Sequence, residues 1–396
     1  MENLSEFADC ADLAVSSALT EDMSDHFYDH SSDHAVDLSD DHGWPWSLPV
    51  PQALVTIGVV IPFFQREHGY LANALASIAG QAGVSTVRFD IVVVDDASPV
   101  DPHVELAAFA PSDRFQLRIV AQANAGPAAA RNRGLDALGA CDLVAFLDSD
   151  DIWDPRHIAR ALRAFEREEC DLFFCDSEHS PKETLFSLQR FRERVATPER
   201  LLVEGTPSYF HPNFGVDVVA GAYVSHTSTI VFRNRPPLAR MRFDLAQGWI
   251  GEDHLMWATL ASKSRLVAFD PRVGSKRGEG VGIFTRLDLG DPAVAFRRHA
   301  CGVRKFRAFA RRFTLGEWAK EQIDALRDEH GFELSRLVLR KGHRLLLDGP
   351  ETRRLLRRNL GELARYIPRH LADGFRRRLI ASRPASTRDR DTVLHS

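Results

Sequence analysis

Short apolar runs alternate with helix-length segments from Leu54 to Leu147, and this alternation constrains the fold more than any other feature of the chain. Apolar runs of this length are typical of strands buried on both faces of a parallel sheet. Strands that are separated by helices indicate right-handed βαβ units. The predicted strands are Val55–Ile61, Phe89–Val94, Leu117–Ala121 and Leu143–Leu147, and the predicted helices are Leu71–Ile78 and Ala128–Leu138.

The second half of the sequence is more mixed. We expect an α/β fold with a mostly parallel sheet of βαβ units flanked by helices, followed by a helical carboxyl-terminal region. No glycine fingerprint follows the first strand, which disfavours the dinucleotide-binding version of this fold. The pattern predicts helices over 155–170 and 255–261, strands over 172–175, 222–232 and 266–269, an irregular stretch over 178–215, and amphipathic helices beyond Pro292 that break at Gly331, Gly349-Pro350 and Pro368.

Composition places the chain among ordinary globular proteins. It has 396 residues, of which 44% are hydrophobic and 27% charged, enough for two or three domains. No apolar run is long enough to predict a transmembrane span, and the acidic amino terminus does not resemble a signal peptide. The five cysteines show no metal-ligand or paired spacing, which indicates reduced thiols and a cytoplasmic location.

The two ends of the chain carry opposite charge. Residues 1–50 contain twelve Asp or Glu and no Lys or Arg, whereas residues 301–396 contain twenty-three Lys or Arg against twelve Asp or Glu. We interpret 1–52 as an acidic, disordered tail; the alternative is a metal-binding or autoinhibitory arm. The basic helices of 291–396 fit an interfacial surface for anionic lipid, a solvated outer face or a dimer contact. They lack the aromatic interleaving expected of a nucleic-acid module.

Carboxylates stand where the predicted strands end. Asp148, Asp150 and Asp151 follow the fourth strand directly, and Asp95-Asp96 follows the second. In open α/β sheets the ligand crevice lies at the carboxyl ends of the strands. Carboxylates this close raise one another's pKa, so a divalent cation is the simplest compensation. The pattern therefore predicts a metal-assisted phosphate site, although an Asp pair after a strand is also typical of a turn or helix cap.

The order of these motifs resembles the family 2 glycosyltransferases of the GT-A fold over roughly residues 54–285. The resemblance implies an inverting, non-processive hexosyltransferase with a nucleotide-binding half over 53–160 and an acceptor-binding half over 161–290. The motifs that carry it are Val59-Val60-Ile61-Pro62-Phe63-Phe64, Val92-Val93-Val94-Asp95-Asp96-Ala97-Ser98, Asn124-Ala125-Gly126-Pro127-Ala128-Ala129-Ala130-Arg131-Asn132, Phe146-Leu147-Asp148-Ser149-Asp150-Asp151 and Gly251-Glu252-Asp253.

The resemblance also implies a role for each matching residue. Asp148 and Asp150 match the DxD motif, which holds Mg²⁺ or Mn²⁺ against the donor diphosphate, and these hard cations prefer oxygen ligands such as carboxylates. Asp151 would cap the following turn or helix. Asp96 matches the carboxylate that accepts a uracil-like base N–H, so a UDP-sugar is favoured. The other donor-binding matches are Pro62 and Phe64 beside the base, Arg131 near the phosphates, and Asn124, Gly126 and Ser149 in the matching loops. Core packing for Phe64 and a surface helix position for Arg131 are the structural alternatives.

On the acceptor side, Asp253 matches the general base that takes the proton of the acceptor hydroxyl, and Glu252 would orient the loop or acceptor. Trp249 and His254 form a candidate acceptor platform, the alternatives being packing for Trp249 and a solvated position for His254. Lys276 and Arg277 open a segment that could close over the diphosphate or simply be a solvated loop.

The expected function is transfer of one sugar from a nucleotide-diphospho-sugar to a hydroxyl-bearing glycan or lipid-linked glycan, in polysaccharide, glycolipid or glycoconjugate biosynthesis. The basic helices allow contact with the inner face of a membrane, and a homodimer is also compatible with them. Two rivals stay open: a sugar-nucleotide nucleotidyltransferase, which would want a Gly-rich basic loop after the first strand, and a non-catalytic nucleotide-sugar-binding relative.

Overall fold

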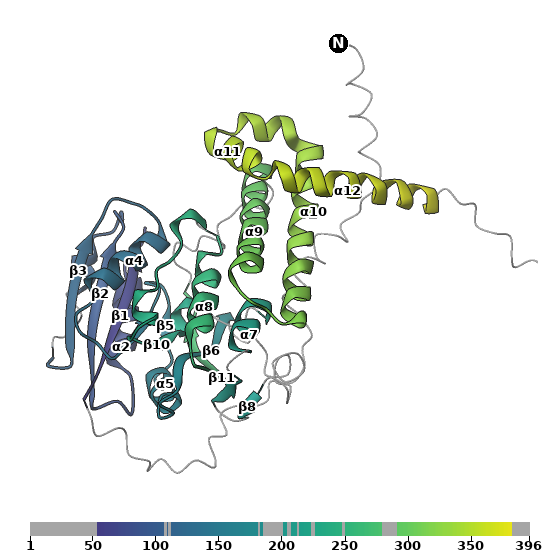
Figure 1. Cartoon of the computed structure of the whole chain (residues 1–396). Coiled ribbons are helices and arrows are strands. Elements are labelled where there is room, and N and C mark those ends of the chain that lie inside the picture. The colour runs from purple at the N-terminus through teal and green to yellow at the C-terminus, as the bar shows by residue number, and fades with distance from the viewer. Residues whose placement is uncertain are drawn as a thin grey trace, which may run out of the picture. The chain divides into compact units, whose positions relative to one another are not determined.

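A computed structural model describes residues 54–106, 109, 112–180, 183–184, 201–203, 207–211, 214–222, 226–247, 250–278 and 291–381. One sheet organises this part of the chain (Figure 1). The expected mostly parallel sheet with flanking helices is confirmed. The acidic tail over 1–52 and most of the irregular stretch over 178–215 lie outside the described residues.

The first half of the sheet is built as the sequence predicted. Four strands pair in parallel, in the order β3 (Phe115–Ala121), β2 (Val87–Asp95), β1 (Val55–Phe63) and β4 (Leu143–Phe146). The helices α2 (Tyr70–Ala79) and α4 (Pro127–Ala137) follow β1 and β3, and a short α3 (Pro102–Leu106) lies between β2 and β3. The bounds of these four strands and of α2 and α4 match the predicted ones within about two residues.

The second half of the sheet changes direction at β10 (Val231–Arg233), which is antiparallel to both β4 and β6 (Cys170–Ser180). Beyond β6, the sheet continues through β11 (Leu266–Lys276), parallel to β6, and β9 (Ser208–Phe210), antiparallel to β11. The remaining elements here are β5 (Ile152–Trp153), α5 (His157–Ala164), β7 (Glu183–Thr184), β8 (Leu201–Val203), α7 (Gly215–Ala222), the 3-10 turns η1 (Thr227–Thr229), η2 (Leu238–Arg240) and η3 (Leu245–Gln247), and α8 (Glu252–Lys263).

One strand prediction was wrong over most of its length. The stretch 222–232 contains β-branched residues and suggested a strand, but the described part of it holds the end of α7, then η1, and only the start of β10. Helix 155–170 is also shorter than predicted, because α5 ends at Ala164. The polar residues around η1 therefore sit in a tight turn at the edge of β4, where they can face the predicted site.

Two apolar cores cover the two faces of the sheet. Alternate residues of β1 point to opposite faces, so Val60 packs in one core and Val59 and Ile61 in the other. The first core also includes Phe306 and Phe309 from the carboxyl-terminal helices. The helical region thus shares a hydrophobic core with the sheet.

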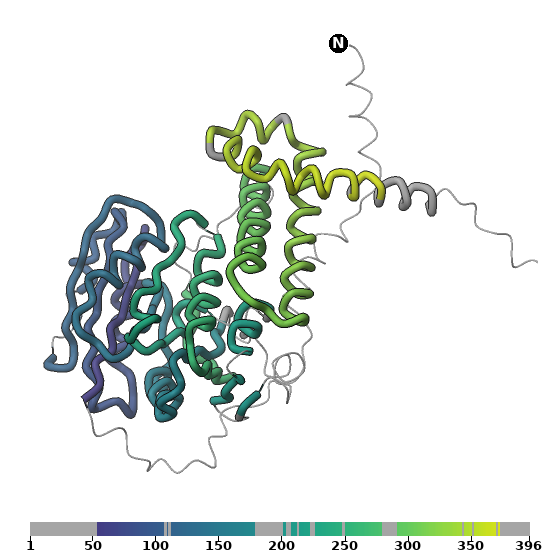
Figure 2. Tube along the Cα trace, viewed as in Figure 1, coloured from purple at the N-terminus to yellow at the C-terminus, as the bar shows by residue number. Residues whose placement is uncertain are grey.

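The carboxyl-terminal region is helical, as expected, but two predicted breaks are absent. Its helices are α9 (Pro292–Arg312), α10 (Glu317–Leu347), α11 (Pro350–Arg358) and α12 (Leu360–Ala381), and α9 lies beside α10 (Figure 2). The break at Gly349-Pro350 is confirmed. Helix α10 runs through Gly331, where a side chain would collide with the Tyr366 ring, and α12 runs through Pro368. No helix in the described part of the chain is long and apolar enough to cross a membrane.

Candidate active site

The turn after β4, Asp148–Asp151, is hereafter called the acidic turn. The Asp151 N–H donates to the Asp148 carbonyl oxygen (3.0 Å), which closes the turn. Gln65, two residues beyond β1, donates from Nε2 to Ser149 Oγ (2.9 Å). The acidic turn is thus tied to the neighbouring strand end, at the edge of the sheet where ligands of α/β folds bind.

Ser228 of η1 holds the acidic turn from the other side. Its Oγ accepts the Asp148 N–H (3.0 Å) and its hydroxyl donates to Asp151 Oδ2 (2.5 Å). The N–H of Gly278, after β11, donates to Asp151 Oδ1 (3.1 Å). Only glycine fits at 278, because a Cβ there would lie 1.7 Å from the Asp150 carbonyl oxygen. Asp151 therefore joins three segments, and its carboxylate does not cap α5, which begins without a side-chain cap.

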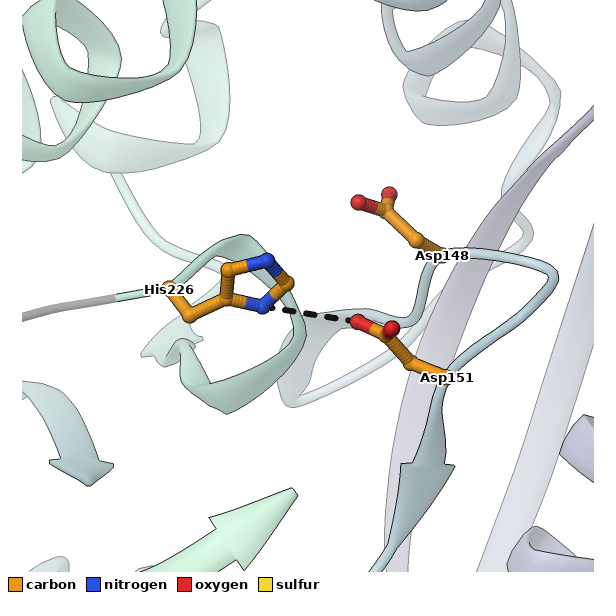
Figure 3. A group of neighbouring side chains, drawn as sticks. All are labelled: Asp148, Asp151 and His226. Atoms are coloured by element: carbon orange, nitrogen blue, oxygen red, sulfur yellow. Dashed lines mark ion pairs between the residues drawn. The ribbon is translucent and has the colours of Figure 1, made fainter. Parts of the chain in front are cut away.

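A candidate cation site is formed by Asp148, Asp151 and His226 (Figure 3), which each offer a ligand atom within 4.8 Å of the others. His226 Nδ1 lies 3.4 Å from Asp151 Oδ2. Two carboxylates and an imidazole suit a divalent ion such as Mn²⁺, so the residues present fit the metal implied by the sequence. Asp150, the second DxD residue, is not part of this group, and its metal role stays a prediction.

Burial and crowding set the charges of the acidic turn. Burial, and then the neighbouring carboxylates, raise the pKa of Asp150 to about 7. The same two causes raise the pKa of Asp151 to about 7. Burial opposes the ionisation of Asp148 too, but Arg131 outweighs it and lowers the pKa of Asp148. Burial lowers the pKa of His226, which favours the neutral imidazole that a metal needs.

Arg131 is the cation at the centre of this site. It projects from α4, is only 5% exposed, and donates from Nη2 to Asp148 Oδ1 (2.6 Å). Its Nη1 lies 3.8 Å from Glu252 Oε1, and its guanidinium lies 5.4 Å from the Phe243 ring centroid. The surface alternative for Arg131 is therefore excluded: the side chain links the acidic turn to the start of α8.

Asn132 fixes the backbone of Phe243, the residue whose ring lies against the Arg131 guanidinium. Its side-chain amide donates to the Phe243 carbonyl (3.0 Å) and accepts the Phe243 N–H (2.8 Å). This two-point contact fixes the loop before η3 against α4. It gives a structural reason for an asparagine next to Arg131.

Asp96 anchors the loop that leads into α4. Its Oδ1 accepts from Gln122 Nε2 (2.8 Å) and the Ala125 N–H (2.7 Å), and its Oδ2 accepts from the Gly126 N–H (2.8 Å). Asn124 donates to the Asp96 carbonyl (3.0 Å). These contacts bring the predicted donor-loop residues together. The base contact of Asp96 stays a prediction, as do those of Pro62 and Phe64, whose side chains are half-buried.

Glu252 and Asp253 form the first turn of α8, where the helix dipole favours negative charge. Burial, and then the adjacent Asp253, raise the pKa of Glu252 to about 8, against the opposing effect of Arg131. Asp253 is half-buried and its Oδ1 accepts the His254 N–H (2.6 Å). The two neighbours therefore differ: Glu252 is held as the neutral acid near pH 7, and Asp253 is the more accessible carboxylate.

His254 is a core residue, contrary to both the acceptor-platform and the solvated expectation. It is buried, and its Nε2 lies 2.6 Å from the Val219 carbonyl of α7. Its ring centroid is 4.7 Å from that of Phe309 on α9. His254 thus fixes α8 between α7 and α9. Trp249 lies outside the described residues.

Lys305 of α9 is a site residue that the sequence did not reveal. Its stem covers Gly251, where a Cβ would lie 2.5 Å from Lys305 Cδ and where φ is +82°. Burial lowers the pKa of Lys305 to about 8, although Asp253 and then Glu252 favour its charged form. A buried cation therefore lies beside the predicted base. It is 52 residues away in sequence and belongs to no local motif.

The two basic residues after β11 lie at the edge of the site. Lys276 is largely exposed and pairs with Glu178 (3.6 Å). The Arg277 N–H donates to the Glu178 carbonyl (2.9 Å), and its charge helps to lower the pKa of Asp148. The segment beyond Gly278 that was expected to close over the diphosphate lies outside the described residues.

Comparisons with known proteins agree with this geometry. The model of the family described as Glycosyl transferase family 2 matches residues 58–223. The chain is 32% identical over 240 residues to the succinoglycan biosynthesis protein ExoW of Rhizobium meliloti, which covers 60% of this chain and 74% of that protein. It is 27% identical over 237 residues to an uncharacterized glycosyltransferase of Rickettsia conorii, which covers 57% of this chain and 33% of the relative.

Among solved structures, the mannosyltransferase PcManGT of Pyrobaculum calidifontis, in complex with GDP-Man and Mn²⁺, has a TM-score of 0.50 at 16% identity, over 86% of this chain and 89% of that one. That likeness supports the GT-A type of fold. The sequence match to ExoW and to the family model carries the assignment: the chain belongs to the family 2 glycosyltransferases and is a glycosyltransferase.

Proposed function

We propose that this glycosyltransferase is metal-dependent and inverting, and that it moves one sugar from a nucleotide-diphospho-sugar, preferentially a UDP-sugar, to a hydroxyl of a glycan acceptor. One observation carries the proposal. Arg131 contacts Asp148 at 2.6 Å and approaches Glu252 at 3.8 Å, so the predicted phosphate-binding turn and the predicted base share one charged cluster. Leaving group and incoming hydroxyl can therefore be held at the same place.

Asp253 is proposed to take the proton of the acceptor hydroxyl as its oxygen attacks the anomeric carbon from the face opposite the diphosphate. Arg131 would stabilise the negative charge that develops on the departing diphosphate. Glu252, protonated near neutral pH, would orient the acceptor side of the cluster. A bound divalent ion would add positive charge at the diphosphate, held by Asp148 together with Asp150 or with Asp151 and His226.

The test of the base is Asp253→Asn. We expect transfer to fall about 10²- to 10⁴-fold, the range of general-base catalysis, while calorimetry shows donor binding within about twofold of the wild type. His254 and the apolar face of α8 stay unchanged in this variant. A variant with normal turnover would remove Asp253 from the base role.

The metal ligands can be assigned by comparing Asp150→Ala with His226→Ala. If the DxD pair holds the ion, Asp150→Ala loses Mn²⁺-dependent nucleotide binding and His226→Ala keeps it. If Asp148, Asp151 and His226 hold the ion, His226→Ala loses Mn²⁺-dependent nucleotide binding and Asp150→Ala keeps it. Nucleotide binding that is indifferent to EDTA in the wild type would contradict metal dependence itself.

The acceptor is proposed to be a glycan or a lipid-linked glycan, used in polysaccharide or glycoconjugate synthesis. The relative ExoW is named for succinoglycan biosynthesis, and the basic helices would bring the enzyme to the inner face of a membrane. Flotation of the full chain with phosphatidylglycerol vesicles, compared with phosphatidylcholine vesicles, tests this location. Equal binding to both would contradict it.

A further inference from the structure

A cavity of about 360 Å³ opens beside α9. Its lining includes no residue of the acidic turn and is rich in arginine. Its walls come from η3 with the residue before it, from α9 and from the end of α11. We call it the arginine groove. It is lined by Asp244, Ala246, Gln247, Arg304, Arg307, Ala308, Arg311, Arg312 and Arg358.

The spacing on α9 explains why the arginines gather. Arg304, Arg307 and Arg311 recur at intervals of three and four residues, which places them along one face of the helix. Arg358, the last residue of α11, joins them from a separate element. The groove is thus assembled by the packing of α11 against α9, and no single segment of the sequence contains it.

Positive charge in the groove exceeds the negative charge that faces it. Arg312 pairs with Asp244, the one carboxylate among the lining residues, and Arg307 pairs with Glu362 (3.3 Å). Arg304 donates to the Ala246 carbonyl. Within the described part of the chain, Arg311 and Arg358 are exposed and have no ion-pair partner. Like charges in a hollow repel one another and raise the local concentration of anions.

We propose that the arginine groove binds a phosphate or diphosphate group of the acceptor, an inference that rests on the proposed function. Guanidinium groups match phosphate oxygens with two parallel hydrogen bonds, and the cavity is within the usual size of a small-ligand site. A neutral sugar would leave the excess charge uncompensated. A phosphate-bearing ligand would balance it.

Two lining elements of the groove, η3 and α9, adjoin the start of α8, which carries the proposed base. Gln247 donates from Nε2 to the Cys301 carbonyl of α9 (3.2 Å), and the chain reaches Gly251 and α8 four residues later. Lys305, next to Arg304 on α9, covers Gly251. A ligand fixed by its phosphate in the groove would therefore contact α9, the helix whose Lys305 covers the residue before α8.

The test measures the binding of inorganic pyrophosphate to the full chain by calorimetry, in the presence of EDTA and without donor. We expect Arg311→Ala/Arg358→Ala to bind at least about tenfold more weakly than the wild type, because two charge-assisted contacts are lost. The control is Arg354→Ala/Arg357→Ala, which removes the same charge from exposed positions of α11 outside the groove, and it should bind like the wild type. Undetectable binding to the wild type, or equal losses in the two double variants, would overturn the proposal.

Vesicles identify the source of the phosphate once pyrophosphate binding is established. If phosphatidylglycerol vesicles bind the wild type and the control but not Arg311→Ala/Arg358→Ala, the groove takes a lipid headgroup as well. If both double variants float equally with them, the groove takes the phosphate of the acceptor alone. Both measurements report binding and not turnover. A negative result for the arginine groove is therefore distinguishable from a negative result for Asp253 as the base, which is measured by turnover.

Discussion

The acidic turn and the arginine groove both hold more charge of one sign than their surroundings balance, and they differ in burial. Around the acidic turn, burial raises the pKa of Asp150 and Asp151 to about 7. In the groove, Arg312 has a side chain that is 48% exposed, so water screens its charge. The same charge imbalance therefore costs more free energy in the acidic turn than in the arginine groove. Four substitutions test this contrast, and they follow in order of decreasing expected effect.

Arg131→Met should destabilise the protein by about 3–5 kcal/mol, since removal of one partner leaves buried charge uncompensated. Urea unfolding measures the effect. Asp148→Asn in the same chain should recover part of the loss, because the two residues interact directly. A variant within about 1 kcal/mol of the wild type would show that the cluster is far better hydrated than its burial indicates.

Glu252→Gln should flatten the dependence of stability on pH. The folded-state pKa of Glu252 is raised from its ordinary value of 4.5 to about 8, so its stabilising contribution is complete below pH 4.5 and is lost as pH rises through 8. Each pKa unit corresponds to about 1.4 kcal/mol. The free energy of unfolding of the wild type should therefore fall between these pH values more steeply than that of Glu252→Gln.

A control for this experiment is Glu317→Gln on α10, whose side chain is 86% exposed. It should follow the wild-type curve through the same pH range. If Glu252→Gln also follows it, then Glu252 is ionised in the folded protein and the raised pKa is wrong.

Lys305→Met should shift the loss of activity at acidic pH to higher pH, because a nearby positive charge favours the carboxylate form of the base. The acidic limb of the profile of kcat/KM against pH reports this shift. Lys305→Arg, which keeps the charge, should restore the limb. An unchanged limb in Lys305→Met, together with lower stability, would mean that Lys305 only packs against Gly251.

Arg358→Ala should change the free energy of unfolding by less than about 0.5 kcal/mol, as exposed surface substitutions usually do. A small gain is expected at low salt, because repulsion within the groove falls, and it should vanish at high salt. A loss comparable to that of Arg131→Met would erase the contrast between the two regions.

The sequence predicted the first half of the sheet well because β1, β2 and β4 are buried on both faces, and such strands leave continuous apolar runs. It failed over most of the described part of 222–232, where Ala222 ends α7 and Thr227–Thr229 form η1 instead of a long strand. The sequence also predicted a helix break at Gly331, which lies inside α10. That glycine is required by the Tyr366 ring, a contact between residues 35 apart that no local pattern shows.

The site divides in the same way between local motifs and distant contacts. Asp148, Glu252, Asp253 and Arg131 belong to local motifs, so the sequence identifies them, and Arg131 joins the acidic turn to α8. Lys305 was missed because its relation to Asp253 exists only after α9 packs on α8. The arginine groove was missed for the same reason: Arg358 meets the face of α9 through helix packing alone.

The contact between His254 and Phe309 has a practical consequence for how this protein can be shortened. Phe306 and Phe309 belong to the same hydrophobic core as Trp257 and Phe232, and Lys305 covers the backbone that begins α8. A fragment that stops before Pro292 would expose this apolar surface to water, and exposed patches of this kind promote aggregation. Ala319 and Ile323 of α10 belong to the same core, so the smallest piece expected to remain monodisperse in solution extends at least through α10.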